Sequence, residues 1–300
     1  MRLQGCGTAL VTPFKKDQSV DEPRLRELVQ WQVESGIHFL VPCGSTGEAA
    51  TLSRDEWLRV IDITIEVVGG RVPIVAGATS NATADAVEKA REVAKRKGVN
   101  AILTASPYYN KPTQEGQYQH FKAIAEAVDK PLMLYNVPGR TAANIEPITL
   151  GRLSKIPNII AVKEASGNIS QIAEVFNHVP DTFLVFSGDD AITLPVISLG
   201  GVGIVSVVSN EIPKEMSDLT AAALRGDWQK ARILQRKFLP LMQANFIESN
   251  PMPVKAVLAM MGRIEEVYRL PMVPMKPDTR ARLQQIAAEA GVVKRSAAAD

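Results

Sequence analysis

The fold is decided by the stretch Asn158-Ile159-Ile160-Ala161-Val162-Lys163, an apolar run that ends in a lysine. A short run of this kind is typical of a strand buried on both faces, as strands are in a parallel sheet. In an α/β barrel, a lysine at the end of such a strand would lie at the barrel mouth, where active sites form. There the amine loses hydration, its pKa falls, and it can form a Schiff base with a carbonyl group. The alternative is a lysine that simply reaches solvent.

This run is one unit of a repeated pattern, in which short apolar segments alternate with helical ones. Strands are expected over residues 7–12, 37–41, 72–76, 100–104, 131–135, 159–163, 183–186 and 203–206. Eight such units predict an α/β fold, a (β/α)8 TIM barrel. A doubly wound open sheet is the competing fold, but no G-x-G-x-x-G sequence opens any of the helical segments.

Capping residues mark several helix boundaries. Asp21 caps a helix that Gly36 ends, and Ser53 with Glu56 forms a capping box in front of a second helix. Further helices are expected over residues 83–97, 114–128, 227–243, 251–261 and 278–288.

No strand is expected after Ile212, so the last part of the chain predicts a C-terminal helical appendage on the barrel. We place the barrel, with the active site, at residues 1–225 and the helical domain at residues 226–300. The tail over 292–300 is expected to fray.

The composition narrows the class of protein. Hydrophobic residues make up 46% and charged residues 22% of the chain, which is ordinary for a soluble globular protein. A net charge of +2 gives no reason to expect nucleic acid as a partner. No stretch is long and apolar enough for a signal peptide or a membrane span. Two cysteines, Cys6 and Cys43, make no disulfide framework, so we expect a cytoplasmic protein.

Polar residues follow the predicted strands. After the second strand comes Gly44-Ser45-Thr46-Gly47-Glu48, whose glycines let amide and hydroxyl groups converge on an anion such as a carboxylate. A tight polar turn is the alternative. The fifth strand ends in Tyr135, a phenol that can relay a proton, and Arg140 offers a planar fork for a carboxylate. A packed tyrosine and a solvated arginine are the alternatives here.

Two further loops bear on the site. The loop after the fourth strand carries Tyr108 and Tyr109, which could anchor the loop, contact another subunit or serve the site. The seventh strand leads into Gly188, Asp189 and Asp190. We interpret these aspartates as helix N-terminal residues and the glycine as room for a substrate. The three histidines show no ligand spacing with the aspartates, so no metal is predicted.

An amine, a phenol, an anion cradle and an arginine at one barrel mouth suit imine-forming attack on a small keto acid. The motifs at residues 44–48, 108–112, 135–141, 162–164 and 187–190 also resemble those of the 4-hydroxy-tetrahydrodipicolinate synthases. These are pyruvate-dependent, lysine Schiff-base aldolases in a superfamily with N-acetylneuraminate lyase. The resemblance covers nearly the whole chain.

The resemblance implies condensation of pyruvate with L-aspartate 4-semialdehyde, with a covalent pyruvate imine on Lys163 and no cofactor. It implies a proton relay of Tyr135, Thr46 and a Tyr109 supplied by the neighbouring subunit. The implied substrate-binding residues are Ser45, Thr46, Arg140, Gly188 and the Val205 carbonyl. The implied assembly is a homo-oligomer, a tetramer built as a dimer of dimers.

Two departures from the family pattern matter. Where the synthases often have two threonines, this chain has Ser45-Thr46, as lyase-like relatives do, although Arg140 favours a short aldehyde that bears a carboxylate. Lysine-sensitive bacterial relatives tend to have a small polar residue and histidines where this chain has Ala49, Arg54 and Trp57. The possible lysine-binding residues here are Ala49, Arg54, Trp57, Asn81, Asp85 and Tyr108. An inward-pointing Arg54 would repel the lysine ammonium, so we expect weak or absent inhibition by lysine.

Two other functions remain open on the sequence. The first is a different Schiff-base pyruvate aldolase or lyase, acting on sialic acid or another 2-keto sugar acid. The second is a catalytically silent barrel that serves as a binding subunit, because a fold alone does not prove turnover.

Overall fold

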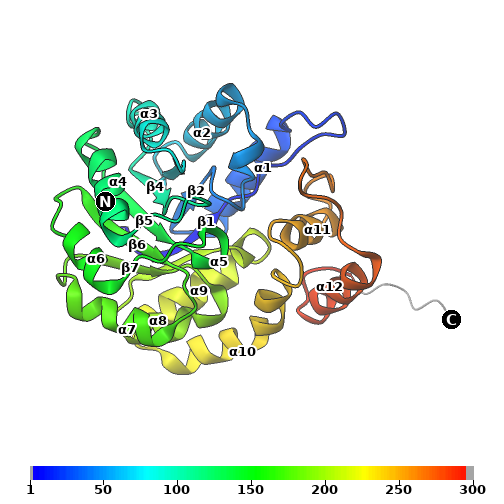
Figure 1. Ribbon diagram of the computed structural model, residues 1–300. Helices are drawn as coiled ribbons and strands as arrows, with labels where there is room; N and C mark the ends of the chain where they lie inside the picture. Colours follow the sequence, from blue (N-terminus) through cyan, green and yellow to red (C-terminus); the bar gives the residue numbers. More distant parts are fainter. Residues whose placement is uncertain (1–2, 295–300) are drawn as a thin grey trace.

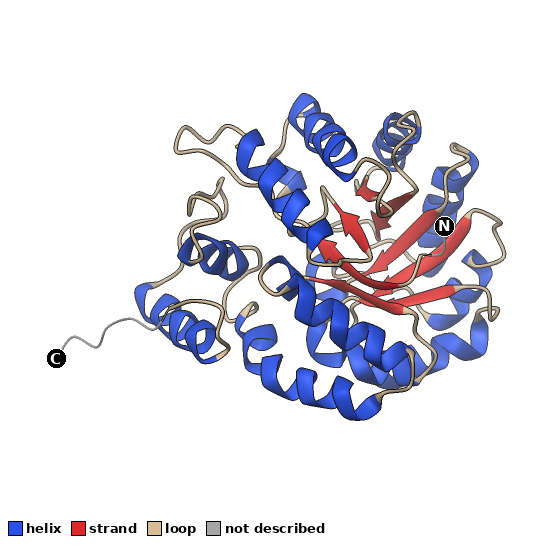
Figure 2. Ribbon diagram, turned by 180° about the vertical axis from the view of Figure 1, so that it is seen from behind, coloured by secondary structure: helices blue, strands red, loops and turns tan. Residues whose placement is uncertain are grey.

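The structure, a computed structural model, describes residues 3–294. Eight parallel strands lie at the centre of the molecule and helices surround them (Figure 1; Figure 2). The strands are β1 (Gly5–Ala9), β2 (Phe39–Val41), β3 (Val75–Gly77), β4 (Ala101–Ala105), β5 (Leu132–Asn136), β6 (Ile159–Glu164), β7 (Leu184–Ser187) and β8 (Gly203–Ser206). Their order in the sheet is β2-β1-β8-β7-β6-β5-β4-β3, and a parallel bridge between Leu40 and Ile74 joins its two ends. The predicted (β/α)8 barrel is confirmed.

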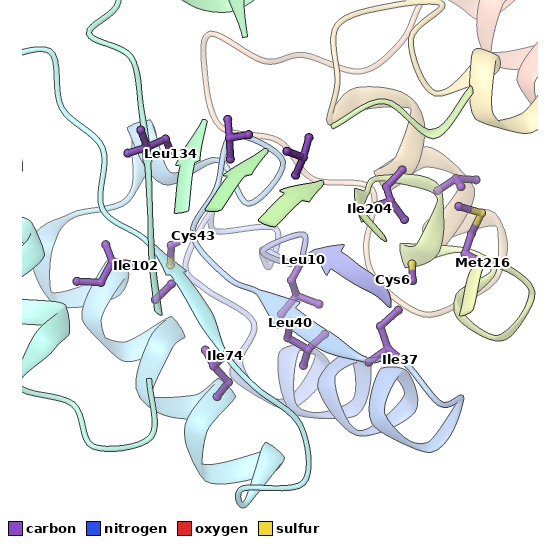
Figure 3. Packing of buried hydrophobic residues seen from close by; sticks show 14 of the residues in the cluster. Cys6, Leu10, Ile37, Leu40, Cys43, Ile74, Ile102, Leu134, Ile204 and Met216 are labelled. Carbon is purple, nitrogen blue, oxygen red and sulfur yellow. The ribbon is translucent and has the colours of Figure 1, made fainter. Parts of the chain in front are cut away.

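The strands are apolar on both faces because they separate two cores. Inside the barrel, the rings of Phe39 and Phe186 pack edge to face with their centroids 5.4 Å apart. The outer core lies between the strands and the helices, and Figure 3 shows part of it, including Leu40 of β2 and Ile102 of β4. In β6, Ala161 belongs to the inner core and its neighbour Val162 to the outer one. This alternation explains the uninterrupted apolar run that predicted a strand buried on both faces.

Most helices surround the barrel, and the last ones belong to the C-terminal part of the chain. They are α1 (Glu22–Glu34), α2 (Arg54–Val68), α3 (Thr83–Ala94), α4 (Gln114–Glu126), α5 (Pro138–Thr141), α6 (Pro147–Leu153), α7 (Ile169–His178), α8 (Thr193–Ser198), α9 (Pro213–Leu224), α10 (Trp228–Ala244), α11 (Met252–Met260) and α12 (Pro277–Glu289). Short 3₁₀ turns are η1 (Ala49–Thr51), η2 (Asp190–Ile192) and η3 (Val208–Asn210). Both predicted caps are present: Asp21 accepts a hydrogen bond from the amide of Arg24, and Ser53 with Glu56 forms the capping box.

The last three helices, α10 to α12, follow the barrel in the chain (Figure 1). Helix α10 packs along α9, and α11 contacts η3. Buried residues of these helices, such as Phe238 and Val257, belong to the same apolar cluster as the barrel's outer core. The predicted helical appendage is therefore present, while its division from the barrel at residue 225 stays a prediction. The predicted fraying of the tail lies mostly outside the described residues.

The first strand differs from its predicted range of 7–12. It begins at Gly5 and ends at Ala9, because loop groups bind the chain beyond it. The amide of Val11 donates to Oδ1 of Asn210 at 3.2 Å, and the Thr12 hydroxyl donates to the carbonyl of Gly47 at 2.7 Å. Within residues 3–294, no helix combines the length and hydropathy needed to cross a bilayer.

Candidate active site

Lys163 and Tyr135 face each other at the carboxyl ends of β6 and β5. The register of the two strands pairs them directly, one residue before each strand ends. The Nζ atom of Lys163 lies 4.2 Å from the centroid of the Tyr135 ring. Both side chains are almost fully enclosed, with relative exposures of 5% and 7%. The prediction that Lys163 lies at a strand end inside the barrel mouth agrees with this geometry.

Burial changes the acidity of both groups. It lowers the pKa of Lys163 to about 7, the nearby Arg140 guanidinium lowers it further, and Asp190 opposes the shift. A substantial fraction of this amine is therefore uncharged at neutral pH, as a nucleophile requires. Burial raises the pKa of Tyr135 to about 12, and the nearby Arg140 guanidinium opposes this shift. The phenol is therefore protonated at neutral pH.

Gly188 lies directly behind the lysine. A Cβ atom at this position would come within 3.1 Å of Cε of Lys163 and 2.7 Å of Cβ of Ala165. Real Cβ atoms essentially never approach another heavy atom as closely as 2.7 Å. Glycine here therefore leaves room for the side chains of Ala165 and Lys163. The predicted close approach of a substrate to Gly188 stays a prediction.

The two aspartates after Gly188 differ in their roles. Asp189 caps η2, since its carboxylate accepts a hydrogen bond from the amide of Ala191 at 2.9 Å, as predicted. Asp190 is the first residue of η2 but is fully buried, and its carboxylate accepts from the amides of Val207 and Val208. It therefore joins the end of β7 to the segment after β8, which the helix N-terminal interpretation did not anticipate.

The loop after β2 brings Thr46 into the site. The Thr46 hydroxyl accepts a hydrogen bond of 2.9 Å from Nδ2 of Asn250, a residue just before α11. The backbone carbonyl of the same asparagine accepts a bond of 3.0 Å from Nη2 of Arg140. One residue of the C-terminal segment thus holds both a hydroxyl of the anion cradle and the arginine of the loop after β5. Ser45, next to Thr46, is exposed.

Two cavities meet at these residues. The smaller, of about 30 Å³, is lined by Lys163 and Gly188 among others. The larger, of about 670 Å³, extends away from the lysine. The lining residues that both cavities share are Gly44, Ser45, Leu103, Tyr135, Arg140 and Asn250. The small cavity at the amine therefore adjoins the larger one at Tyr135 and Arg140.

Two predicted residues lie apart from this chamber. Tyr109 is 87% exposed, has a positive φ of 73°, and lines neither of the two cavities. Its side chain does not complete the site of its own chain. The Val205 side chain belongs to the inner core, and Val207, two residues on, lines the smaller cavity instead.

The residues proposed for lysine binding mostly line the larger cavity. They are Ala49, Arg54, Trp57, Asp85 and Tyr108, whereas Asn81 is not part of this lining. The Arg54 guanidinium pairs with Glu92 at 3.1 Å, and the Trp57 indole donates to the carbonyl of Gly77 at 2.9 Å. Trp57 is therefore held in place by a buried contact of its own chain.

Metal-binding groups do not gather at this site. Among residues 3–294, no three side chains of the His, Cys, Asp and Glu types are grouped closely enough to hold a metal ion. Cys6 and Cys43 are buried, unpaired thiols, and burial raises the pKa of each.

Sequence reasoning missed the contribution of the C-terminal segment. Asn250 and Lys255 lie more than 200 residues after the loop they contact. No local pattern marks either residue, because asparagines and lysines are mostly surface residues. The helix expected over residues 251–261 was assigned to the C-terminal appendage and not to the site.

Fold and site together define the class: a (β/α)8 barrel with a desolvated lysine at the carboxyl ends of its strands, suited to Schiff-base chemistry. The chain belongs to the Dihydrodipicolinate synthetase family, whose model matches residues 2–290.

Individual relatives agree with this membership. The 4-hydroxy-tetrahydrodipicolinate synthase of Koribacter versatilis (strain Ellin345) is 72% identical over 299 residues, and both chains are covered completely. The protein of the same name from Acidobacterium capsulatum is 58% identical, with 98% of this chain and 97% of the relative covered. A crystal structure of chloride-inhibited dihydrodipicolinate synthase from Acinetobacter baumannii, complexed with pyruvate, superposes with a TM-score of 0.95. That chain is 43% identical, and the match covers 97% of this chain and 100% of the other.

Proposed function

We propose that this protein condenses pyruvate with L-aspartate 4-semialdehyde to give 4-hydroxy-tetrahydrodipicolinate, the product in the name that its relatives carry. The observation that carries the proposal is the buried amine of Lys163, whose pKa is lowered to about 7 at the mouth of the barrel. The reaction is a step toward lysine and diaminopimelate. The imine on Lys163 supplies the electron sink, so the proposal requires no cofactor.

The first half-reaction activates pyruvate. The uncharged Lys163 amine attacks C2 of pyruvate, and loss of water gives the imine. Removal of a proton from C3 then gives an enamine, a carbon nucleophile. Ser45 and Thr46 would hold the pyruvate carboxylate, and Gly188 and the Val205 carbonyl would border the bound pyruvate.

The second half-reaction joins the substrates. C3 of the enamine attacks the aldehyde carbon, and the oxygen takes up a proton as the new carbon–carbon bond forms. Attack by the amino group of the semialdehyde on the imine carbon then releases Lys163. Arg140 would bind the carboxylate of the semialdehyde, because its guanidinium can pair with a carboxylate and the residue lines both cavities.

Proton transfer would follow a relay of Tyr135, Thr46 and Tyr109. Tyr135 and Thr46 line the small cavity of one chain, while Tyr109 lies outside it and is exposed. The proposal therefore includes a second copy of the chain, whose Tyr109 completes the relay. A tetramer built as a dimer of dimers would supply this contact. The cytoplasmic location of the protein stays a prediction.

Reduction with borohydride tests the covalent step. Intact protein is mixed with pyruvate, reduced, and mapped by mass spectrometry after digestion. The expected result is one pyruvate adduct, located on Lys163. An adduct on another lysine would overturn the assignment of Lys163 as the nucleophile. No adduct at all would overturn the proposal and revive the silent barrel.

Kinetics with L-aspartate 4-semialdehyde, and an assay with sialic acid for comparison, test the second half-reaction. Arg140→Ala should raise KM for the semialdehyde strongly, while trapping of pyruvate on Lys163 continues, and Arg232→Ala on the exposed face of α10 serves as the control. If the wild-type protein cleaves sialic acid and ignores the semialdehyde, the protein is a different pyruvate aldolase.

A further inference from the structure

A buried ion pair joins the loop after β2 to helix α11. Nζ of Lys255 lies 2.6 Å from Oε1 of Glu48, and the two side chains are 0% and 2% exposed. The partners are 207 residues apart in the sequence. The structure therefore ties the end of the anion-cradle loop to the C-terminal helices through two charges that water does not reach.

Aromatic rings enclose the lysine end of this pair. The Nζ atom of Lys255 lies 4.3 Å from the ring centroid of Phe14 and 5.3 Å from that of Tyr268. The second oxygen of Glu48 accepts a 3.5 Å hydrogen bond from the backbone amide of Arg269. Rings attract a cation to their faces, so this enclosure favours one arrangement of the pair.

The pair lies next to the predicted catalytic loop. Glu48 is two residues beyond Thr46 and has a positive φ of 52°, a conformation that needs support from outside the loop. Asn250, which holds the Thr46 hydroxyl, precedes Lys255 by five residues. The segment around α11 therefore holds the loop at two points, at the Thr46 hydroxyl and at the Glu48 carboxylate.

Stability alone is a weak reason for such a pair. Replacing a buried ion pair with apolar residues of similar volume is often neutral or stabilising, because two charges must lose their water. A pair of this kind does fix direction and distance, since a 2.6 Å contact between enclosed groups permits little movement.

We propose that Glu48 and Lys255 are positioning residues that hold the Ser45-Thr46 segment in the geometry needed to bind the pyruvate carboxylate. This inference rests on the proposed function. It makes α11 part of the catalytic apparatus rather than only a packing element.

The central test separates positioning from stability. The single variant Lys255→Met leaves the Glu48 carboxylate buried without its ion-pair partner, so its melting temperature should fall. The double variant Glu48→Gln/Lys255→Met removes both charges and should regain most of that melting temperature. If the pair positions the loop, kcat/KM for pyruvate in the double variant should remain about 10²-fold below that of the wild-type protein, because small misplacement of binding groups is costly.

A milder variant guards against failure to fold. Glu48→Asp keeps both charges and shortens the link by one methylene group, so it should raise KM for pyruvate while changing the melting temperature little. The matched control is Arg280→Met, which removes the Arg280–Glu266 pair of the C-terminal segment without touching the loop. The control should leave both kinetic constants unchanged.

The outcomes distinguish the two proposals. Wild-type kinetics in both the double variant and Glu48→Asp would overturn the positioning role and leave the proposed function intact. Borohydride trapping at saturating pyruvate should still label Lys163 in every variant, because the nucleophile is untouched. If the wild-type protein itself forms no adduct, the proposed function fails.

Discussion

The two halves of the candidate site are held by different kinds of contact. The strand-end half consists of Tyr135, Lys163 and Gly188. The loop half consists of Ser45, Thr46, Arg140 and Asn250. In the strand-end half, neighbouring parallel strands bring the residues together through backbone hydrogen bonds. In the loop half, side chains bridge segments about 110 and 204 residues apart.

The difference shows where the site is robust and where it is adjustable. Sheet register shifts only if a whole strand slips, so the distance between Lys163 and Tyr135 is a property of the fold. The position of Thr46 depends on a few side-chain contacts, which single substitutions can remove. We therefore expect changes in the strand-end half to abolish chemistry, and changes in the loop half to weaken binding and proton transfer.

The largest effect is expected from Lys163→Ala in the strand-end half. Because Lys163 is the one lysine among the described residues that line the small cavity, kcat should fall by at least about 10³-fold and the borohydride-trapped adduct should disappear. Steady-state assays and intact mass measure both effects. The control is Lys155→Ala, which removes an exposed lysine. Substantial residual turnover in Lys163→Ala would show that another group is the nucleophile.

The next effect is expected from Thr46→Val in the loop half. The variant removes a relay hydroxyl and should lower kcat by about 10²-fold. It also leaves Nδ2 of Asn250 without its acceptor, so the free energy of unfolding should fall by about 1–3 kcal/mol. Thr46→Ser keeps the hydroxyl and should retain most activity. Equal activity in the two variants would exclude Thr46 from the relay.

A smaller effect is expected from Gly188→Ala, which returns to the strand-end half. The new Cβ must push against Cε of Lys163 and Cβ of Ala165, so the rate of imine formation should fall by about 10-fold or more. Rapid-quench trapping with pyruvate measures this rate. The control Gly139→Ala adds a methyl group where, apart from its neighbours in the chain, no described residue has an atom within 4 Å. An unchanged rate in Gly188→Ala would mean that the lysine side chain does not depend on this space.

The pH dependence links the two halves. The uncharged amine is the nucleophile, so the rate of adduct formation with pyruvate should rise as pH increases through about 7 and level off above it. Arg140 lowers the pKa of Lys163, and so Arg140→Met should move the midpoint to higher pH. Arg232→Met should not move it. A midpoint near the ordinary lysine value in the wild-type protein would contradict the desolvated amine.

The smallest effect is expected outside both halves, in the larger cavity. Arg54 pairs with Glu92, and both residues line this cavity. The Glu92 carboxylate is therefore already neutralised and attracts the ammonium group of a bound L-lysine less. L-lysine at sub-millimolar concentration should leave the steady-state rate nearly unchanged. Strong inhibition in that range would overturn the expectation, and Arg54→Ala would then show whether the arginine limits it.

Much of this architecture was readable from local sequence. Eight apolar runs separated by helical segments predicted the barrel, and the structure confirms it. The runs are apolar throughout because each strand packs one face into the inner core and the other into the outer core. The prediction for the first strand was wrong at both ends, since Val11 and Thr12 bond to loop groups that no local pattern reveals. Lys163 and Tyr135 could be predicted because strand-end positions are fixed once the barrel is known, and Arg140 because it follows Tyr135 closely after the same strand.

The sequence by itself determined the alternation of strands and helices and the reactive groups at the strand ends, because hydrophobic periodicity and strand termini are local properties of a chain. Only the tertiary structure decided how those groups are supported. Asn250 reaches Thr46, and Lys255 reaches Glu48, through contacts between segments that chain closure brings together. The physical reason is that burial, which lowers the pKa of Lys163 and isolates the Glu48–Lys255 pair, exists only after the segments have packed.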